Sequence, residues 1–292
     1  MEFKKLALNC IEQLRPYFSD NQCRICDCTV GGTFMWRDHH GTEYAIEDGL
    51  LYLKTTFPEI SFAPPRGPKS GRGSYDRIIE YCAGNGLKAR LCSVSDAALE
   101  EILGIFPGAE AISDRACSDY LYRSEDIISL AGRKYSTQRN HINRFLKENP
   151  AWSFEPITAD NLDGARAFFE KYAREHIKDY PAYTEGNRKA LEVLDNMCAY
   201  GQFGGLLIVN GGIIGASLAE IMGDTMYIHV EKADASYHGS YPMLMNRFAK
   251  TFAADGAAFI NREEDDGVEG LRKSKLSYHP VELLDKYTVV LG

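Results

Sequence analysis

The chain has 292 residues, of which 45% are hydrophobic and 25% charged, a composition typical of a globular protein long enough to build two cores. Its formal net charge of −8 argues against broad, unspecific binding to nucleic acid or anionic membranes, although local basic patches remain compatible with it. No stretch approaches the roughly 18 consecutive apolar residues that span a bilayer, and the N-terminal apolar run is too broken for a signal peptide. A cytoplasmic location is therefore expected.

The N-terminal half predicts a hairpin, a loop rich in glycine, proline and basic residues, and then a helix and a strand. The loop lacks the Gly-x-x-x-x-Gly-Lys-[Ser/Thr] pattern of a nucleotide P-loop. Periodicity and turn residues place the elements in chain order as follows: strands over 43–46 and 50–53, the loop over 63–74, a helix over 75–83, a strand over 88–94, and a helix capped at Ser95-Asp96 that ends at Leu103.

A basic segment without any acid follows, over 133–147. Its apolar residues recur at helical spacing, which predicts a helix with most of its basic side chains facing solvent. Arg139 is a candidate contact for donor phosphate, because a guanidinium fork binds phosphate oxygens bidentately. The alternative is a solvated linker helix between two domains.

The C-terminal half predicts a strand, two helices, three antiparallel strands, a small loop, a helix, and two further strands. Asn210-Gly211 is a strong hairpin signal inside this series. The order resembles the GCN5-related N-acetyltransferase (GNAT) fold, in which the loop after the fourth strand holds the donor's pyrophosphate. The N-terminal half repeats the same pattern less clearly. The expected fold class is therefore α/β with mixed sheets, as tandem GNAT-like domains over residues 1–145 and 146–292.

The presumed phosphate cradle lies between the strand over 225–231 and the helix that follows. A helix N-terminus favours an anion, and Gly239 permits close backbone approach or a positive φ. The alternative is an ordinary strand-to-helix connection. His238 is either a hydrogen-bonding loop residue or a catalyst. The cradle comprises Tyr237, His238, Gly239, Ser240 and Tyr241.

A charged segment over 261–278 is dense first in acids and then in bases. A carboxylate here, or Glu231 at the end of the preceding strand, is a candidate general base for an incoming amine or hydroxyl. The alternatives are a surface loop with compensating charges and a solvated strand end. The catalytic candidates are Glu231, Glu263 and Asp265, and the further donor-phosphate candidates are Arg272, Lys273 and Lys275.

Three of the eight cysteines are closely spaced, at Cys23, Cys26 and Cys28. The spacing suggests a zinc or redox site, but no second Cys-x-x-Cys follows and the surrounding segment is hydrophobic. Structural thiols in a reducing compartment, with no metal site, are the favoured interpretation.

Two segments, 132–145 and 261–280, resemble soluble bacterial proteins grouped with the catalytic domain of phosphatidylglycerol lysyltransferases. The resemblance covers essentially the whole chain. It implies tandem acetyltransferase-like domains, as in the Fem-type peptidoglycan aminoacyltransferases. It also implies transfer of an aminoacyl group from aminoacyl-tRNA to a lipid hydroxyl or a cell-wall amine. The chain departs from the lysyltransferases proper because it lacks their large transmembrane region.

Three functional hypotheses follow. The first is an aminoacyltransferase with tRNA as partner and a small molecule, lipid or peptide as acceptor. The second is an acyl-CoA-dependent N-acetyltransferase. The third is a GNAT-like binding module without catalysis. In the first two, aminoacyl-tRNA or acyl-CoA is the donor substrate and no cofactor is tightly bound.

Overall fold

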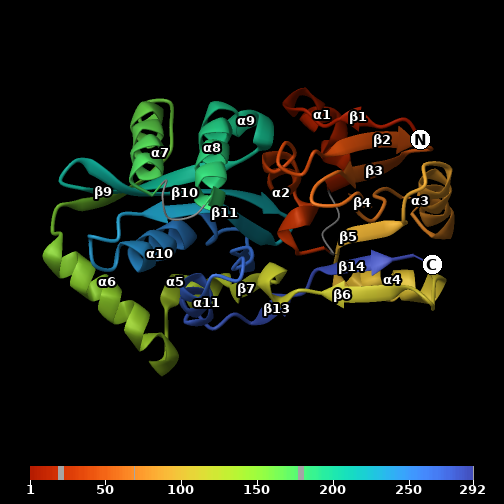
Figure 1. The fold of residues 1–292 in the computed structure, drawn as a ribbon. Helices are drawn as coiled ribbons and strands as arrows, with labels where there is room; N and C mark the ends of the chain where they lie inside the picture. The colour runs from red at the N-terminus through yellow and green to blue at the C-terminus, as the bar shows by residue number, and fades with distance from the viewer. Residues whose placement is uncertain (19–22, 69, 177–180, 292) are drawn as a thin grey trace. The chain divides into compact units, whose positions relative to one another are not determined.

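The computed structural model describes residues 1–18, 23–68, 70–176 and 181–291. Figure 1 shows a mixed α/β fold with two sheets. The chain divides into two compact units. Unit 1 comprises residues 1–119, 264–269 and 283–292, and unit 2 comprises residues 120–263 and 270–282.

Unit 1 is built on a seven-stranded sheet of order β1-β2-β3-β4-β5-β14-β6. Its core consists of apolar side chains from the sheet and from the two helices α3 and α4, which pack against it. The strands are β1 (Lys4–Lys5), β2 (Glu43–Glu47), β3 (Leu50–Thr55), β4 (Ser61–Phe62), β5 (Arg90–Val94), β6 (Glu110–Ser113) and β14 (Tyr287–Val290). The helices are η1 (Leu8–Cys10), α1 (Ile11–Leu14), η2 (Arg15–Phe18), η3 (Cys26–Cys28), α2 (Val30–Met35), α3 (Arg72–Gly84), α4 (Asp96–Ile105) and η4 (Arg115–Cys117).

Unit 2 is built on the second seven-stranded sheet, of order β13-β7-β12-β11-β10-β9-β8. Figure 1 shows α7 and α8 on one face of this sheet and α10 on the other. The strands are β7 (Asp119–Arg123), β8 (Trp152–Pro156), β9 (Phe203–Val209), β10 (Gly212–Met222), β11 (Thr225–Ala233), β12 (Phe259–Asn261) and β13 (Glu282–Leu284). The helices are α5 (Ser124–Ser129), η5 (Arg133–Tyr135), α6 (Ser136–Glu148), α7 (Leu162–His176), α8 (Pro181–Asp195), α9 (Met197–Tyr200), α10 (Ser240–Phe252) and α11 (Glu269–Leu276).

The two sheets share one topology, which confirms the predicted duplication of a mixed α/β unit. In the first sheet β3 pairs antiparallel with β2 and β4, and β4 then pairs parallel with β5 across α3. In the second sheet β10 pairs antiparallel with β9 and β11, and β11 pairs parallel with β12 across α10. The predicted hairpin at Asn210-Gly211 is present, with both residues at positive φ.

The boundaries differ from the expected division at 145/146, which falls inside α6. The chain passes from unit 1 to unit 2 between Asp119 and Tyr120, and its last ten residues return to unit 1. As a result, β7 lies beside β12 in the second sheet, whereas β14 lies beside β5 in the first. The terminal strand was expected in the C-terminal sheet. It pairs instead across a long sequence separation, which local pattern does not reveal.

Among the described residues, no helix is both long enough and apolar enough to cross a membrane.

Candidate functional site

The candidate site of unit 2 lies where β11 and β12 diverge. The parallel pairing of these strands ends at Tyr227 and Asn261, although β11 continues to Ala233. After Asn261 the chain stays hydrogen-bonded to the other neighbour, because the backbone N–H of Arg262 donates to the carbonyl of Tyr120 at 3.1 Å. The strands therefore separate and leave room for side chains between them.

Two ion pairs connect the diverging strands. Arg262 Nη2 donates to Glu231 Oε1 at 2.7 Å, and both side chains are about nine-tenths buried. His229 lies two residues earlier on β11, with Nδ1 at 2.7 Å from Glu263 Oε1 and Nε2 at 2.7 Å from Glu220 Oε1. Burial disfavours the charged imidazole, but the hydrogen bonds to Glu220 and Glu263 outweigh it and raise the pKa of His229 to about 10.

The His229 cluster predicts a specific pH dependence of stability. Because the pKa in the folded protein lies above that of an unfolded histidine, the stabilisation is complete below about pH 6.5 and is lost as the pH rises through about 10. The advantage of wild type over His229→Gln should therefore shrink between pH 7 and 10, by up to about 1.4 kcal/mol per pH unit. Urea denaturation of both proteins across this range checks it. A constant difference would contradict the assignment.

A cavity of about 150 Å³ adjoins the point of divergence. Helix α6, the first turn of α10, α11 and the residues after β12 form its walls. Arg262 lines it and keeps Nη1 without a hydrogen-bond partner among the described residues. Gln138 of α6 donates from Nε2 to the carbonyl of Ser277 at 2.6 Å, which ties α6 to the end of α11. The lining residues are Thr137, Gln138, His141, Tyr241, Pro242, Arg262, Ser274, Ser277 and Tyr278.

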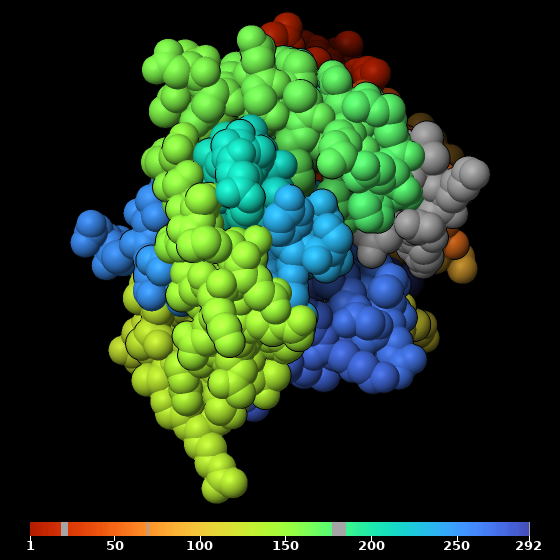
Figure 2. Space-filling view, turned by 90° about the vertical axis from the view of Figure 1, so that its left-hand side faces the viewer, coloured from red at the N-terminus to blue at the C-terminus, as the bar shows by residue number. Residues whose placement is uncertain are grey.

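Helix α6 packs against the loop over 237–241 that was expected to be a phosphate cradle. Gly239 has φ +83°, and a Cβ added there would lie 2.3 Å from the carbonyl oxygen of His141. His141 Nδ1 also lies 2.9 Å from Nε2 of His238 in the same loop. Figure 2 shows the yellow-green α6 lying beside the light-blue start of α10 and the darker blue α11. Glycine is required here because both the left-handed backbone and the close approach of α6 exclude a side chain.

Replacing Gly239 by alanine should destabilise the protein by about 2 kcal/mol, from the positive φ and the overlap with His141 together. Gly211→Ala is a matched control, because Gly211 has φ +76° and nothing within 4 Å of its added Cβ. That variant should lose only about 1 kcal/mol. Urea denaturation measures both variants, and equal losses would mean that α6 does not press on the loop.

The structure separates the predicted catalytic acids. Glu231 and Glu263 both lie at the divergence of β11 and β12, but Asp265 belongs to unit 1. There Asp265 is fully buried and pairs with Arg115 Nη1 at 3.3 Å. Its Oδ1 also accepts from the backbone N–H of Gly267 at 2.9 Å. Asp265 thus holds the turn that follows β12.

Several predicted phosphate contacts have other hydrogen-bond partners. Arg139 donates to the carbonyls of Leu130 and Gly132, which fixes the turn before α6. Lys275 is buried and donates to the carbonyls of Arg262, at 2.6 Å, and Glu263, at 3.2 Å. Arg272 and Lys273 lie on α11, which the charge pattern alone did not identify as a helix.

The remaining cradle residues hold the loop and border the cavity. Ser240 Oγ donates to the carbonyl of Asp234 at 2.8 Å, and the backbone N–H of Tyr237 donates to the same carbonyl at 3.3 Å. Tyr241 lines the cavity, with its hydroxyl 3.2 Å from that of Tyr172 on α7.

Sequence reasoning did not single out Arg262, Gln138, His141 or His229. The only local signal for Arg262 was its position at the start of the charged segment. The other three lie on elements whose proximity depends on the tertiary fold.

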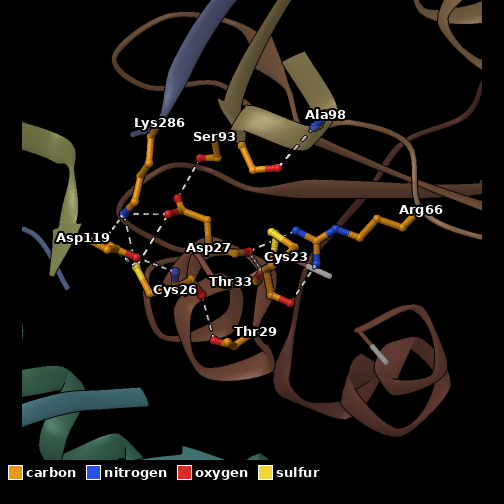
Figure 3. The surroundings of a disulfide bond; sticks show 12 residues. Cys23, Cys26, Asp27, Thr29, Thr33, Arg66, Ser93, Ala98, Asp119 and Lys286 are labelled. Carbon is orange, nitrogen blue, oxygen red and sulfur yellow. Dashed lines mark hydrogen bonds and ion pairs between the residues drawn. A yellow bond between two sulfur atoms is a disulfide. The ribbon is translucent and has the colours of Figure 1, made fainter. Parts of the chain in front are cut away.

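Unit 1 contains a second buried charged cluster, around Lys286 (Figure 3). Lys286 Nζ lies 2.8 Å from a carboxylate oxygen of Asp27, 2.8 Å from Asp119 and 2.9 Å from Glu264. It also lies 3.2 Å from Cys26 Sγ. Ligand atoms of Cys26, Asp119 and Glu264 lie within 4.8 Å of one another, a spacing that suits a metal ion, but the ammonium already stands among them. We therefore propose no metal there.

Burial and the Lys286 ammonium have opposite effects on the pKa values of the acidic groups in this cluster. Burial raises the pKa of the Asp27 and Glu264 carboxyls, but Lys286 overrides it and holds both pKa values below their usual range. Burial dominates at Asp119 and raises its pKa to about 7. Burial, with Asp119, also raises the pKa of the Cys26 thiol well above its usual value, which disfavours the thiolate.

The expectation of three free thiols is wrong for two of them. Cys23 and Cys28 form a disulfide with a Cα–Cα distance of 6.3 Å, within the range that the bond requires. Figure 3 shows the Cys26 sulfur directed toward Lys286 and Asp119 rather than toward the disulfide. Cys26 is the first residue of η3, and its side chain is buried.

Comparisons with known proteins agree with this architecture. A sequence model of the family described as "Phosphatidylglycerol lysyltransferase, C-terminal" matches residues 22–290. A conserved protein of unknown function from Bacteroides thetaiotaomicron is 31% identical, with a TM-score of 0.90 over 100% of both chains. L-PGS from Bacillus licheniformis is 11% identical, with a TM-score of 0.69 over 99% of this chain and 93% of that one. FemX is 10% identical, with a TM-score of 0.54 over 100% and 98%.

A curated relative, an uncharacterized protein of Mycoplasmoides gallisepticum, is 25% identical over 183 residues. The match covers 61% of this chain and 58% of that protein, so it spans little more than half of the relative's length. The family match extends over nearly the whole sequence, and L-PGS and FemX share the fold. The chain therefore belongs to the family of the phosphatidylglycerol lysyltransferase C-terminal region.

Proposed function

We propose that unit 2 transfers an aminoacyl group from aminoacyl-tRNA to an amine or hydroxyl acceptor. Membership of the lysyltransferase family supports the reaction class. Aminoacyl-tRNA is favoured over acyl-CoA as the donor because α6 packs on the predicted pyrophosphate cradle, through Gly239 and His141.

This packing disfavours acyl-CoA as the donor. A pyrophosphate bound by the loop needs the loop's backbone N–H groups to face an open groove. Here His141 and Phe145 of α6 lie within 3.3 Å of a Cβ built on Gly239, so the loop is covered on that side. An aminoacyl ester needs no such cradle, because its charged phosphates lie beyond the terminal ribose.

The cavity suits the small reacting end of such a donor. A volume of about 150 Å³ holds a group the size of a benzene ring and excludes a whole nucleotide. When an amine or hydroxyl attacks the ester carbonyl, negative charge develops on the carbonyl oxygen. A fixed cation or N–H donor at that point stabilises the transition state. Arg262 is a cavity-lining residue suited to this role, since Glu231 fixes Nη2 while Nη1 has no hydrogen-bond partner among the described residues.

The basic helix makes only a limited electrostatic contribution to tRNA binding. Lys134 pairs with Asp126 at 3.4 Å, and Arg144 pairs with Glu148 at 2.7 Å. Arg139 is engaged with backbone carbonyls. Arg133 and Lys147 are exposed, and so are Lys134 and Arg144 within their ion pairs. Binding should therefore depend on salt through few phosphate contacts, with a shallow slope of log affinity against log salt.

Equilibrium binding tests the donor assignment. Isothermal titration with charged tRNAs and, separately, with acetyl-CoA should show binding of an aminoacyl-tRNA and none of acetyl-CoA. The Gly239→Ala variant disturbs the contact with α6. It should also show no binding of acetyl-CoA. Tight binding of acetyl-CoA alone would replace this proposal with the N-acetyltransferase alternative. Binding of neither donor would favour the non-catalytic module.

A further inference from the structure

Two histidines from different elements meet at the wall of the cavity. His141 of α6 lines the cavity, and His238 lies in the loop before α10. Nδ1 of His141 and Nε2 of His238 are 2.9 Å apart, and the ring centroids are 5.0 Å apart. The contact of Gly239 with the carbonyl of His141 fixes the backbone next to both rings. The pair is therefore held in place from both elements.

The carboxylates at the divergence of β11 and β12 are poorly placed to take a proton from a substrate in the cavity. Glu231 is bound to Arg262 and Glu263 to His229, each at 2.7 Å. A carboxylate that took up a proton would weaken its own ion pair in a buried setting. Neither acid is among the residues that line the cavity, whereas His141 is.

We propose that His141 accepts the proton of the attacking acceptor and that His238 is the positioning residue that orients it. The inference rests on the proposed aminoacyl transfer. A base held by the hydrogen bond that it donates to a third group is the recurrent arrangement for activating a nucleophile. A single proton lies between the two rings. When His141 Nδ1–H donates to His238 Nε2, the other nitrogen of His141 has a free lone pair for the substrate.

The step balances without any further reactant. The acceptor's amine nitrogen or hydroxyl oxygen attacks the carbonyl carbon of the aminoacyl ester and loses a proton to His141 Nε2. A new C–N or C–O bond forms, and the bond between the carbonyl carbon and the ribose oxygen breaks. The proton on His141 then passes to that ribose oxygen, which restores the neutral imidazole and leaves tRNA with a free hydroxyl.

The test combines kinetics with donor binding. His141→Gln should lower the single-turnover rate constant about 100-fold or more, with the affinity for aminoacyl-tRNA unchanged. His238→Gln should lower it less, about 10-fold, because the base remains but is less well oriented. His39→Gln, at an exposed position in unit 1, is the matched control and should behave as wild type.

The pH profile separates this role from a structural one. The pH dependence of the rate should differ between wild type and His141→Gln, because glutamine cannot accept a proton at the position of the base. Tyr241, Arg262 and Tyr278 face the same cavity, and Asp234 lies in the loop of His238, so their contributions persist in both proteins.

The outcomes of this test are distinguishable. A wild-type rate retained in His141→Gln, or a pH profile of that variant that matches the wild-type profile, would overturn the role of His141. Failure of wild type to discharge any aminoacyl-tRNA would instead refute the proposed function on which this inference rests.

Discussion

Replacement of Lys286 by methionine is expected to destabilise the protein by about 3–5 kcal/mol at pH 7, a loss typical of breaking a buried ion pair. The side chain is only 10% exposed and is the shared partner of Asp27, Asp119 and Glu264. Methionine keeps most of the volume of lysine but leaves the three acidic side chains without their cation. Urea denaturation of the two proteins measures the difference.

The loss should shrink in acid. Lys286 holds the pKa values of Asp27 and Glu264 low, so its stabilisation is present above about pH 4 and fades as those carboxylates become protonated at lower pH. Lys171→Met is the matched control, because Lys171 is 60% exposed in its pair with Glu175. An exposed pair contributes only about 0–1 kcal/mol. A loss as small as the control's would mean that the Lys286 cluster does not hold unit 1 together.

Replacement of Arg262 by methionine should destabilise the protein to a similar extent, about 3–5 kcal/mol, and also abolish aminoacyl transfer. The stability loss arises because Glu231, whose side chain is 11% exposed, would retain a buried charge without a partner. The activity loss arises because the cavity would lose its guanidinium.

The double variant Arg262→Met with Glu231→Gln separates the two effects. Removing both charges should restore most of the stability, because no unpaired buried charge remains. Transfer should stay absent, because the cation is still missing. Recovery of transfer together with stability would show that Arg262 acts only as a structural partner of Glu231.

The sequence predicted the central elements of unit 2, because their patterns are local. The three-strand meander, the helix after Gly239 and the alternation of strand and helix follow from periodicity and turn residues. The sequence did not predict that β7 would join the second sheet and β14 the first. β7 and β14 are short strands, and their partners β12 and β5 are set by tertiary pairing rather than by anything in their own residues.

Some residues of the candidate site are among those that the sequence singled out. Glu231 and Glu263 were expected from their positions near the strand end, and the structure places both at the divergence of β11 and β12. Asp265, only two residues after Glu263, lies in the other unit, to which residues 264–269 belong. The covering of the cradle by α6 could not be predicted, because His141 and Gly239 are 98 positions apart in the sequence and only packing brings them together.

The central claim is that unit 2 discharges an aminoacyl-tRNA rather than acetyl-CoA. The most direct measurement incubates purified protein with individually charged, labelled tRNAs, or with labelled acetyl-CoA, in the presence and absence of a total cell extract as the source of acceptor. The account predicts extract-dependent loss of label from at least one aminoacyl-tRNA, with no loss in Arg262→Met plus Glu231→Gln and no consumption of acetyl-CoA. Consumption of acetyl-CoA by wild type, with every aminoacyl-tRNA left intact, would contradict it.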